Sequence, residues 1–145
     1  MFNLKGRVVV VSGASSGLGA QMAKGFAAQG ADLVITARRF EKLEVLAEEI
    51  RKMGVQCLPI RCDVTNVESV NNCAKEAVAH FKHIDVLVNC AGAAANNGVL
   101  NMTDSEWQFT IDTDLTSVFY VTRAFANIMK EQKYGRIINI ASMYG

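Results

Sequence analysis

The sequence predicts an α/β fold, a doubly wound parallel sheet with helices on both faces. Short apolar runs alternate with longer segments whose apolar residues recur at helical spacing, which is typical of repeated strand–helix–strand units. The first run, Val8 to Val11, is β-branched throughout and is expected to form a strand buried on both faces. It leads directly into Ser-Gly-Ala-Ser-Ser-Gly-Leu-Gly at positions 12–19, a glycine-rich turn that opens a helix. The pattern favours one domain over residues 1–145.

Glycines and a proline mark the limits of the next elements. Gly30 and Gly54 follow the first two expected helices, where glycine can take the left-handed capping conformation. The only proline, Pro59, interrupts the third strand and indicates an edge position, which the strand order 3-2-1-4-5 would provide. The expected segments are a helix from the turn to Gln29, a strand at Ala31–Thr36, a helix from Phe40 to Met53 and a strand at Val55–Arg61.

Two hydroxyl-x-x-Glu sequences, which begin at Thr65 and Thr103, are expected to cap the remaining helices. The segments that follow are a helix to Phe81, a strand at Ile84–Asn89, a long helix that ends near Gly135 and a strand at Arg136–Ala141. The apolar residues expected on the buried side of the long helix are Trp107, Ile111, Leu115, Val118, Phe119, Phe125 and Met129.

Composition narrows the function classes. The chain has 145 residues, half of them hydrophobic, and a net charge of +1, which offers no electrostatic basis for nucleic-acid binding. Its apolar runs are shorter than a bilayer span and its first residues do not resemble a signal peptide, so we expect a soluble cytoplasmic protein without a membrane partner.

No metal site is predicted. The cysteines lack a Cys-x-x-Cys pairing and are expected to be reduced, mostly buried thiols; they are Cys57, Cys62, Cys73 and Cys90. His80 and His83 could share a metal, but the C-terminal turn of a helix, which favours positive charge, explains them better.

The glycine-rich turn is the first candidate binding site. Gly13 can adopt backbone angles closed to other residues, Gly17 allows the chain to approach a ligand, and Gly19 allows the helix to pack closely. The free N–H groups of the first helical turn favour an anion such as the diphosphate of a dinucleotide. The remaining residues expected to contact it are Ser15, Ser16 and Leu18.

The end of the second strand bears on which dinucleotide would bind. An NAD-binding fold would place an acidic residue there, against the ribose 2′-hydroxyl, whereas this sequence has Ala37 followed by Arg38 and Arg39. Arginine binds phosphate through paired hydrogen bonds, so the sequence predicts NADP(H), with NAD(H) still possible. The alternative is two solvated arginines at a helix start, where positive charge is unfavourable without an anion.

The motifs together resemble the short-chain dehydrogenase/reductase family, whose members have a Rossmann fold. The resemblance extends over the whole chain. Among the members of the family, the chain is similar to 3-oxoacyl-[acyl-carrier-protein] reductases and gluconate 5-dehydrogenases. The matching motifs are Ser-Gly-x-x-x-Gly-x-Gly at 12–19, Cys-Asp-Val at 62–64, Asn-Cys-Ala-Gly at 89–92 and Gly-Arg-Ile-Ile-Asn-Ile-Ala-Ser at 135–142.

The resemblance implies roles for residues at the later strand ends. Asp63 and Val64 would hold the adenine edge, although the carboxylate could instead simply precede a Thr65 cap. Asn89 would tie neighbouring strands while Ala91 and Gly92 run beside the cofactor ribose. Ser142 would be catalytic and hydrogen-bond the oxygen of the substrate.

Three departures limit the resemblance. Cys90 replaces an asparagine of the family's Asn-Asn-Ala-Gly, and Asp114 replaces the asparagine that takes part in the proton relay. An aspartate lacks the amide donor, so that part of the relay is in doubt. The family's Tyr-x-x-x-Lys should follow Ser142, and no tyrosine here is followed four residues later by lysine; the tyrosines are Tyr120, Tyr134 and Tyr144. We therefore expect residues 1–145 to be the N-terminal, cofactor-binding portion of a longer enzyme, inactive alone.

The function predicted from these motifs is an NADP(H)-dependent oxidoreductase that interconverts a ketone and a secondary alcohol. Oxoacyl thioesters, sugar acids and alicyclic ketones such as steroids all remain open as substrates. The resemblance further implies a homodimer or homotetramer, with part of the Trp107 to Met129 face as an interface. A non-catalytic NADP(H)-binding or sensing module is the alternative, and a regulatory fragment that pairs with intact subunits is a third possibility.

Overall fold

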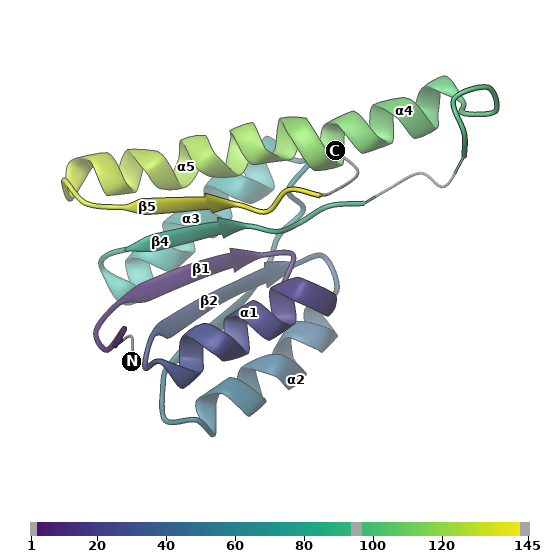
Figure 1. Cartoon of the computed structure of the whole chain (residues 1–145). Helices are drawn as coiled ribbons and strands as arrows, with labels where there is room; N and C mark the ends of the chain where they lie inside the picture. The colour runs from purple at the N-terminus through teal and green to yellow at the C-terminus, as the bar shows by residue number, and fades with distance from the viewer. Residues whose placement is uncertain (1–2, 94–96, 143–145) are drawn as a thin grey trace.

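A computed structural model describes residues 3–93 and 97–142, and Tyr144 lies outside them. The described residues form a parallel sheet with helices on both faces (Figure 1), as the sequence predicts. The strands are β1 (Val8–Ser12), β2 (Asp32–Ala37), β3 (Cys57–Arg61), β4 (Val86–Asn89) and β5 (Arg136–Asn139). The helices are α1 (Gly17–Ala28), α2 (Phe40–Arg51), α3 (Val67–Phe81), α4 (Asp104–Ile111), the π-helical segment η1 (Asp112–Thr116) and α5 (Ser117–Glu131).

The strand order is β3-β2-β1-β4-β5, which confirms the predicted order. The central strand β1 pairs with β2 and β4, and Val9 lies in register with Leu33 and Val86. Pro59 lies in β3, at one edge of the sheet, where its missing N–H costs no ladder hydrogen bond. The last strand, β5, forms the other edge, and its four residues are exposed.

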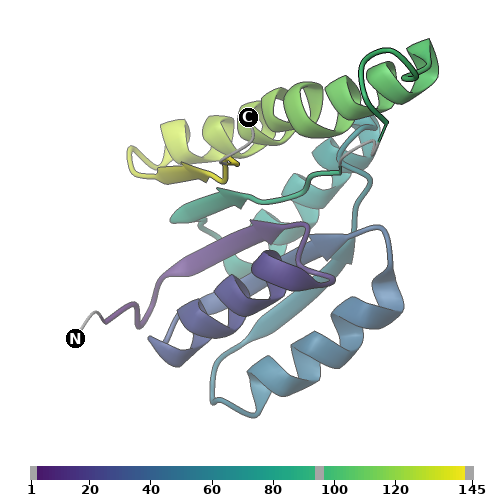
Figure 2. The same cartoon turned by 45° about the vertical axis from the view of Figure 1, so that its right-hand side comes forward.

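Two hydrophobic cores fill the space on either side of the sheet. Successive side chains of a strand point to opposite faces, so Val8 and Val10 belong to one core and Val9 and Val11 to the other. The first core packs against α3 and α5, and the second against α1 and α2. Figures 1 and 2 show these two helix layers on opposite faces of the sheet.

The long helix predicted after Thr103 is confirmed in outline, but its buried face is different. It consists of α4, η1 and α5, which continue one another along one side of the molecule (Figure 1). Its fully buried positions recur every four residues and are Thr113, Ser117, Val121, Phe125 and Met129. Three residues expected on that face are instead 59%, 65% and 55% exposed; they are Trp107, Leu115 and Phe119. The prediction failed partly because α4 has no buried residue, so the face that carries Trp107 is not covered within the described part of the chain.

One of the two predicted caps is correct. At α4, Thr103 and Glu106 form the full capping box, and hydrogen bonds from Thr103 lower the pKa of Glu106. At α3 the cap is Asn66, one residue later than predicted, and its side chain accepts a hydrogen bond from the Ser69 amide at 2.9 Å. Asparagine competes well with threonine for this position, because its carbonyl reaches the same amides.

The third, fourth and fifth strands are shorter than predicted. The strand β3 begins at Cys57 instead of Val55, and β4 begins at Val86 instead of Ile84. The strand β5 ends at Asn139 instead of Ala141. Ile84 is nevertheless buried, although it lies before the first residue of β4. Periodicity reports burial and not hydrogen bonding, so strand limits taken from it extend too far.

Asp85 fastens the start of β1 to the start of β4. Its side chain is only 5% exposed and accepts hydrogen bonds from the Val8 amide at 2.9 Å and the Arg7 guanidinium at 2.8 Å. His83 lies on the same carboxylate, with Nε2 3.2 Å from Asp85 Oδ2. His83 thus lies beside a carboxylate and after the end of α3 at Phe81, so only His80 lies in the last turn of a helix as predicted.

Replacing Asp85 with alanine is expected to lower the free energy of unfolding by about 2 kcal/mol, because the buried Val8 amide loses its acceptor. Urea denaturation monitored by circular dichroism measures the change. Glu48→Ala is the control, since Glu48 pairs with Arg51 at the surface and should change stability by less than about 0.5 kcal/mol. Equal effects of both substitutions would contradict the anchoring role of Asp85.

Candidate functional site

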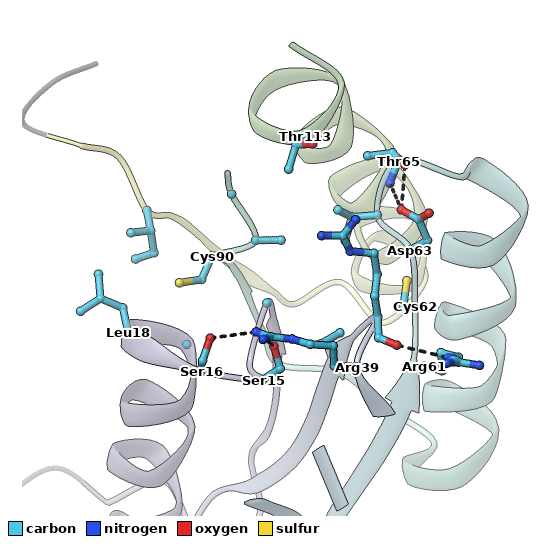
Figure 3. Close-up of a pocket in the computed structure, with 18 of the residues that line it drawn as sticks. Ser15, Ser16, Leu18, Arg39, Arg61, Cys62, Asp63, Thr65, Cys90 and Thr113 are labelled. Atoms are coloured by element: carbon cyan, nitrogen blue, oxygen red, sulfur yellow. Dashed lines mark hydrogen bonds between the residues drawn. The ribbon is translucent and has the colours of Figure 1, made fainter. Parts of the chain in front are cut away.

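A cavity of about 670 Å³ lies where all five strands end. Its lining comes from the segment after each strand: Gly13 after β1, Arg38 after β2, Asp63 after β3, Ala91 after β4 and Ile140 after β5. Figure 3 shows these segments converging around the cavity. The carboxyl ends of parallel strands are where open α/β sheets bind ligands, so the topology alone favours this cavity as the site.

Most of the predicted binding residues meet there. Those that line the cavity are Gly13, Ser15, Ser16, Leu18, Gly19, Arg38, Arg39, Asp63, Val64, Ala91 and Gly92. Those that do not line it are Gly17, Asn89, Asp114 and Ser142. Lining residues that the sequence analysis did not select are Ala37, Glu41, Arg61, Cys62, Thr65, Cys90, Thr113 and Ile140. Arg61 and Cys62 could have been found from their place at the end of a predicted strand.

Gly13 and Gly17 hold the turn after β1 in a shape that favours glycine. Their φ angles are +74° and +58°, in the left-handed region. A Cβ on Gly13 would lie 2.6 Å from Cα of Ala91, so the turn packs directly against the segment after β4. A Cβ on Gly19 would collide with the carbonyl of Gly13, so this glycine lets the start of α1 pack closely against the turn after β1.

The start of α1 is available to an anion. The residue before the helix, Ser16, does not cap it through its side chain. Its hydroxyl instead accepts a hydrogen bond from Arg39 at 3.2 Å, and the Ser15 hydroxyl accepts another from the same guanidinium nitrogen at 3.0 Å (Figure 3). The N–H groups at the start of α1 therefore remain for a ligand, with a cation directly beside them.

Arginines dominate the charge at this side of the cavity. Arg38, Arg39 and Arg61 line it, against the carboxylates of Glu41 and Asp63. Arg61 donates from Nε to the Arg38 carbonyl at 3.2 Å, which holds the end of β2 to the end of β3. Both arginines that follow β2 are exposed, so their guanidinium groups can reach an anionic ligand without losing a buried partner.

Asp63 forms a local turn at the end of β3. Its Oδ1 accepts hydrogen bonds from the amide of Thr65 at 3.0 Å and from its hydroxyl at 2.7 Å (Figure 3). The Asp63 amide donates to the Ser69 hydroxyl at 3.0 Å. The carboxylate thus shapes the loop ahead of α3 and also lines the cavity, although the cap that follows it is Asn66 and not Thr65 as the local alternative assumed.

Two polar side chains, Asn89 and Ser12, hold the end of β4 and the segment after it in place through hydrogen bonds. Asn89 donates through Nδ2 to Asn139 at 2.8 Å and to Thr122 at 3.0 Å, so it joins β4 to β5 and α5. The Ser12 hydroxyl accepts from the Cys90 amide at 3.2 Å. Asn89 therefore ties neighbouring elements, as the resemblance implies, from below the cavity and not from its wall.

Asp114 and Thr113 project from η1 toward the same segment. The Asp114 carboxylate accepts a hydrogen bond from the Ala93 amide at 2.8 Å. A carboxylate can only accept hydrogen bonds, and the Ala93 amide supplies it with a donor here. Thr113 lines the cavity, and its buried hydroxyl has no partner within the described part of the chain. A buried polar group of this kind suits a bound ligand or water that would satisfy it.

Ser142 lies in the segment after β5 and does not line the cavity. The Ile140 amide donates to the Asn89 carbonyl at 2.9 Å, which keeps this segment beside β4. Ser142 is exposed, two residues beyond Ile140, which itself lines the cavity. The segment after β5 therefore places the Ser142 hydroxyl outside the set of residues that line the cavity.

Comparison with known proteins identifies the fold family. A family model described as "short chain dehydrogenase" matches residues 7–145. The chain belongs to the short-chain dehydrogenase/reductase family. It is 37% identical to a 3-oxoacyl-[acyl-carrier-protein] reductase of Synechocystis, with 100% of this chain and 59% of the relative aligned.

Solved structures of the family share this fold closely. A metagenomic short-chain oxidoreductase in complex with NADP superposes with a TM-score of 0.91 at 37% identity, over 97% of this chain and 64% of the other. An NAD⁺-bound xylitol dehydrogenase superposes with a TM-score of 0.95 at 32% identity, over 98% and 55%. The chain thus spans less than two thirds of the length of these relatives.

Family membership is consistent with the geometry of the cavity. Short-chain dehydrogenases bind NAD or NADP, and the cavity of this chain lies at the carboxyl ends of the strands, where such folds bind nucleotides. At the two departures from the family motifs, the Cys90 amide donates to the Ser12 hydroxyl and the Asp114 carboxylate accepts from the Ala93 amide. Within the described residues no helix is long and apolar enough to cross a membrane.

Proposed function

We propose that this chain is the cofactor-binding portion of an NADP(H)-dependent oxidoreductase that interconverts a ketone and a secondary alcohol. The observation that carries the proposal is Arg39, which reaches across the cavity and hydrogen-bonds both Ser15 and Ser16 of the glycine turn. A guanidinium beside two hydroxyls and an open helix start is an arrangement suited to phosphate.

In this proposal each strand end binds one part of the nucleotide. The diphosphate lies on the start of α1, and the 2′-phosphate lies against Arg38 and Arg39. Asp63 and Val64 contact the adenine edge, and Ala91 and Gly92 run beside the ribose. Support comes from the lining of the cavity, which includes all these residues, and from the lack of an acidic residue directly after β2.

Ser142 is proposed to position the substrate. Its hydroxyl would donate a hydrogen bond to the carbonyl oxygen, or accept one from the alcohol, at the open end of the cavity. When bound, the nicotinamide supplies or accepts the hydride. Asp114 would act at a distance, by holding the Ala93 amide and so the segment after β4. The complete proton relay would need a tyrosine and lysine from chain beyond Gly145, as the resemblance implies.

We further propose that the whole protein acts in the cytoplasm as a homodimer or homotetramer. The exposed apolar residues of α4, η1 and α5 support a protein interface there; they are Trp107, Phe109, Leu115 and Phe119. Sedimentation of the intact gene product tests the oligomeric state, and a monomer at all concentrations would contradict this part of the proposal.

The alternative is a module that binds NADP(H) without chemistry. It is favoured by Asp114, whose carboxylate is occupied by the Ala93 amide and cannot donate to a relay. NADPH oxidation by the intact gene product with a panel of ketones separates the two functions. Binding of NADPH without oxidation by any ketone would support the module and contradict the oxidoreductase.

Replacing Arg39 with alanine is expected to weaken NADPH binding about 10- to 100-fold, because a charge-assisted contact to the 2′-phosphate is lost. NADH binding should change less than about threefold, since NADH lacks that phosphate. Titration calorimetry with both nucleotides measures the two affinities. Lys24→Ala is the matched control, because Lys24 pairs with Glu49 on the surface of α1 and lies outside the cavity lining. Equal losses for both nucleotides would contradict the assignment of Arg39.

A further inference from the structure

Two buried cysteines pack in the same core cluster behind the wall of the cavity. Cys62 directly follows β3, and Cys73 lies in α3, which packs over that strand end. Each residue is only 3% exposed, and both belong to one cluster of packed core residues. The Ser69 hydroxyl, one helical turn before Cys73, accepts a hydrogen bond from the amide of Asp63, the residue after Cys62, and so holds α3 to this strand end. The pair is thus built from two separate elements that meet at one point.

Only one member of the pair faces the cavity. Cys62 is part of its lining and lies next to Asp63 (Figure 3), whereas Cys73 is not part of the lining and belongs to the core. A small reagent that enters the cavity can therefore meet Cys62 first. A ligand that fills the adenine side of the cavity would cover it.

The two thiols differ in acidity. The hydrogen bond from Cys73, with a further one from Ser69, lowers the pKa of Cys62 although burial opposes it. The same contact and burial raise the pKa of Cys73. Cys62 is therefore the member that forms the thiolate, the reactive species toward peroxides, and Cys73 remains a thiol beside it.

We propose that Cys62 and Cys73 form a peroxide-reactive thiol pair, and that conversion of the pair to a disulfide and occupation of the cavity by a nucleotide exclude each other. The second half of this statement rests on the proposed function. In the first step the Cys62 thiolate attacks hydrogen peroxide, which gives the sulfenic acid and, with one proton, water. In the second step the Cys73 sulfur attacks the Cys62 sulfur, and the disulfide forms as a second water leaves. Two thiols are oxidised and one peroxide is reduced to two waters.

The disulfide would alter the cavity through the neighbouring residues. A covalent bond brings the two sulfur atoms closer than a hydrogen bond does, so the end of β3 must move toward α3. Asp63 follows Cys62 directly and holds Thr65 and Ser69 through its hydrogen bonds. Movement of Cys62 therefore shifts the loop that forms the adenine side of the proposed nucleotide site.

Mass spectrometry of the peroxide-treated protein tests the thiol pair. Proteolytic mapping should find a disulfide that joins Cys62 to Cys73, and a saturating concentration of NADP⁺ should slow its formation at least about tenfold, because the occupied fraction of the protein is shielded. The oxidised protein should bind NADP⁺ at least about tenfold more weakly, which is about 1.4 kcal/mol, with recovery after dithiothreitol.

Variants separate the two steps. Cys73→Ser should stop the reaction at the sulfenic acid of Cys62, which dimedone traps, and Cys73→Ala serves the same purpose if the serine variant is poorly folded. Cys57→Ser is the control, because Cys57 lies in the opposite core, where burial raises its pKa to about 12. It should leave disulfide formation unchanged.

Failure of the thiol pair and failure of the proposed function give different results. A reduced protein that binds neither NADPH nor NADH would contradict the proposed function and the exclusion, while the mapped disulfide would still decide the thiol pair. Peroxide treatment that leaves Cys62 and Cys73 unlinked would overturn the pair itself. A mapped disulfide with unchanged nucleotide affinity would overturn the mutual exclusion.

Discussion

Replacing Gly13 with alanine is expected to weaken nucleotide binding by at least about 100-fold, a loss of about 2.7 kcal/mol. The φ angle of +74° is strained for alanine, and the added Cβ would lie 2.6 Å from Cα of Ala91. The turn cannot easily move to relieve this contact, because the amides of Gly13 and Ala14 donate hydrogen bonds to the Thr36 carbonyl of β2. The turn must therefore move away from the position that suits a diphosphate. Titration calorimetry with NADPH measures the loss.

Gly25→Ala is the matched control for this prediction. Gly25 lies within α1, and a Cβ there would meet nothing within 4 Å. Alanine at this position should stabilise the helix by about 0.5–1 kcal/mol and leave nucleotide affinity unchanged. If Gly13→Ala bound NADPH as tightly as Gly25→Ala does, the glycine turn would not be the diphosphate site.

Replacing Ser142 with alanine is expected to lower kcat about 100- to 1000-fold in the intact gene product, because a donor to the reacting oxygen is lost. Nucleotide affinity should be unchanged, since Ser142 lies beyond the residues that line the cavity. Steady-state oxidation of NADPH with an accepted ketone measures kcat, and calorimetry measures the affinity.

The control is Ser105→Ala, an exposed serine near the start of α4. It should retain kcat within about twofold, as expected for a surface substitution away from the site. A Ser142→Ala variant with the activity of Ser105→Ala would remove Ser142 from the proposed mechanism and leave the binding site in place.

The sheet was predictable because its signals are local. A β-branched run needs only its own side chains to favour a buried strand, and Pro59 excludes a central position through its missing N–H. The cavity followed from topology, since residues after parallel strands must meet at one edge. Gly13, Arg39 and Asp63 could therefore be placed together although they are far apart in sequence.

Features that depend on three-dimensional contacts were not predictable. The π-helical turn at Asp112–Thr116 has no signature in residue types. The exposure of Trp107 and Leu115, which helical spacing had assigned to the core, depends on which part of the long helix lies over the sheet. The contact of Arg39 with the turn serines depends on side-chain conformation. The pairing of Cys62 with Cys73 joins a strand end to a helix, and spacing along the chain does not reveal it.

The four consecutive valines of β1 leave its alignment undetermined by side chains. A shift by one residue would exchange the two faces and still present valine to each core, so hydrophobicity alone does not select one alignment. Selection must come from the ends of the strand, where Asp85 receives the Val8 amide and Ala91 leaves no room beyond Gly13. An extra valine inserted into the run would therefore be tolerated by the interior and would displace the glycine turn by about 3.3 Å. We expect such an insertion mutant to remain folded and to lose the nucleotide binding proposed for this turn.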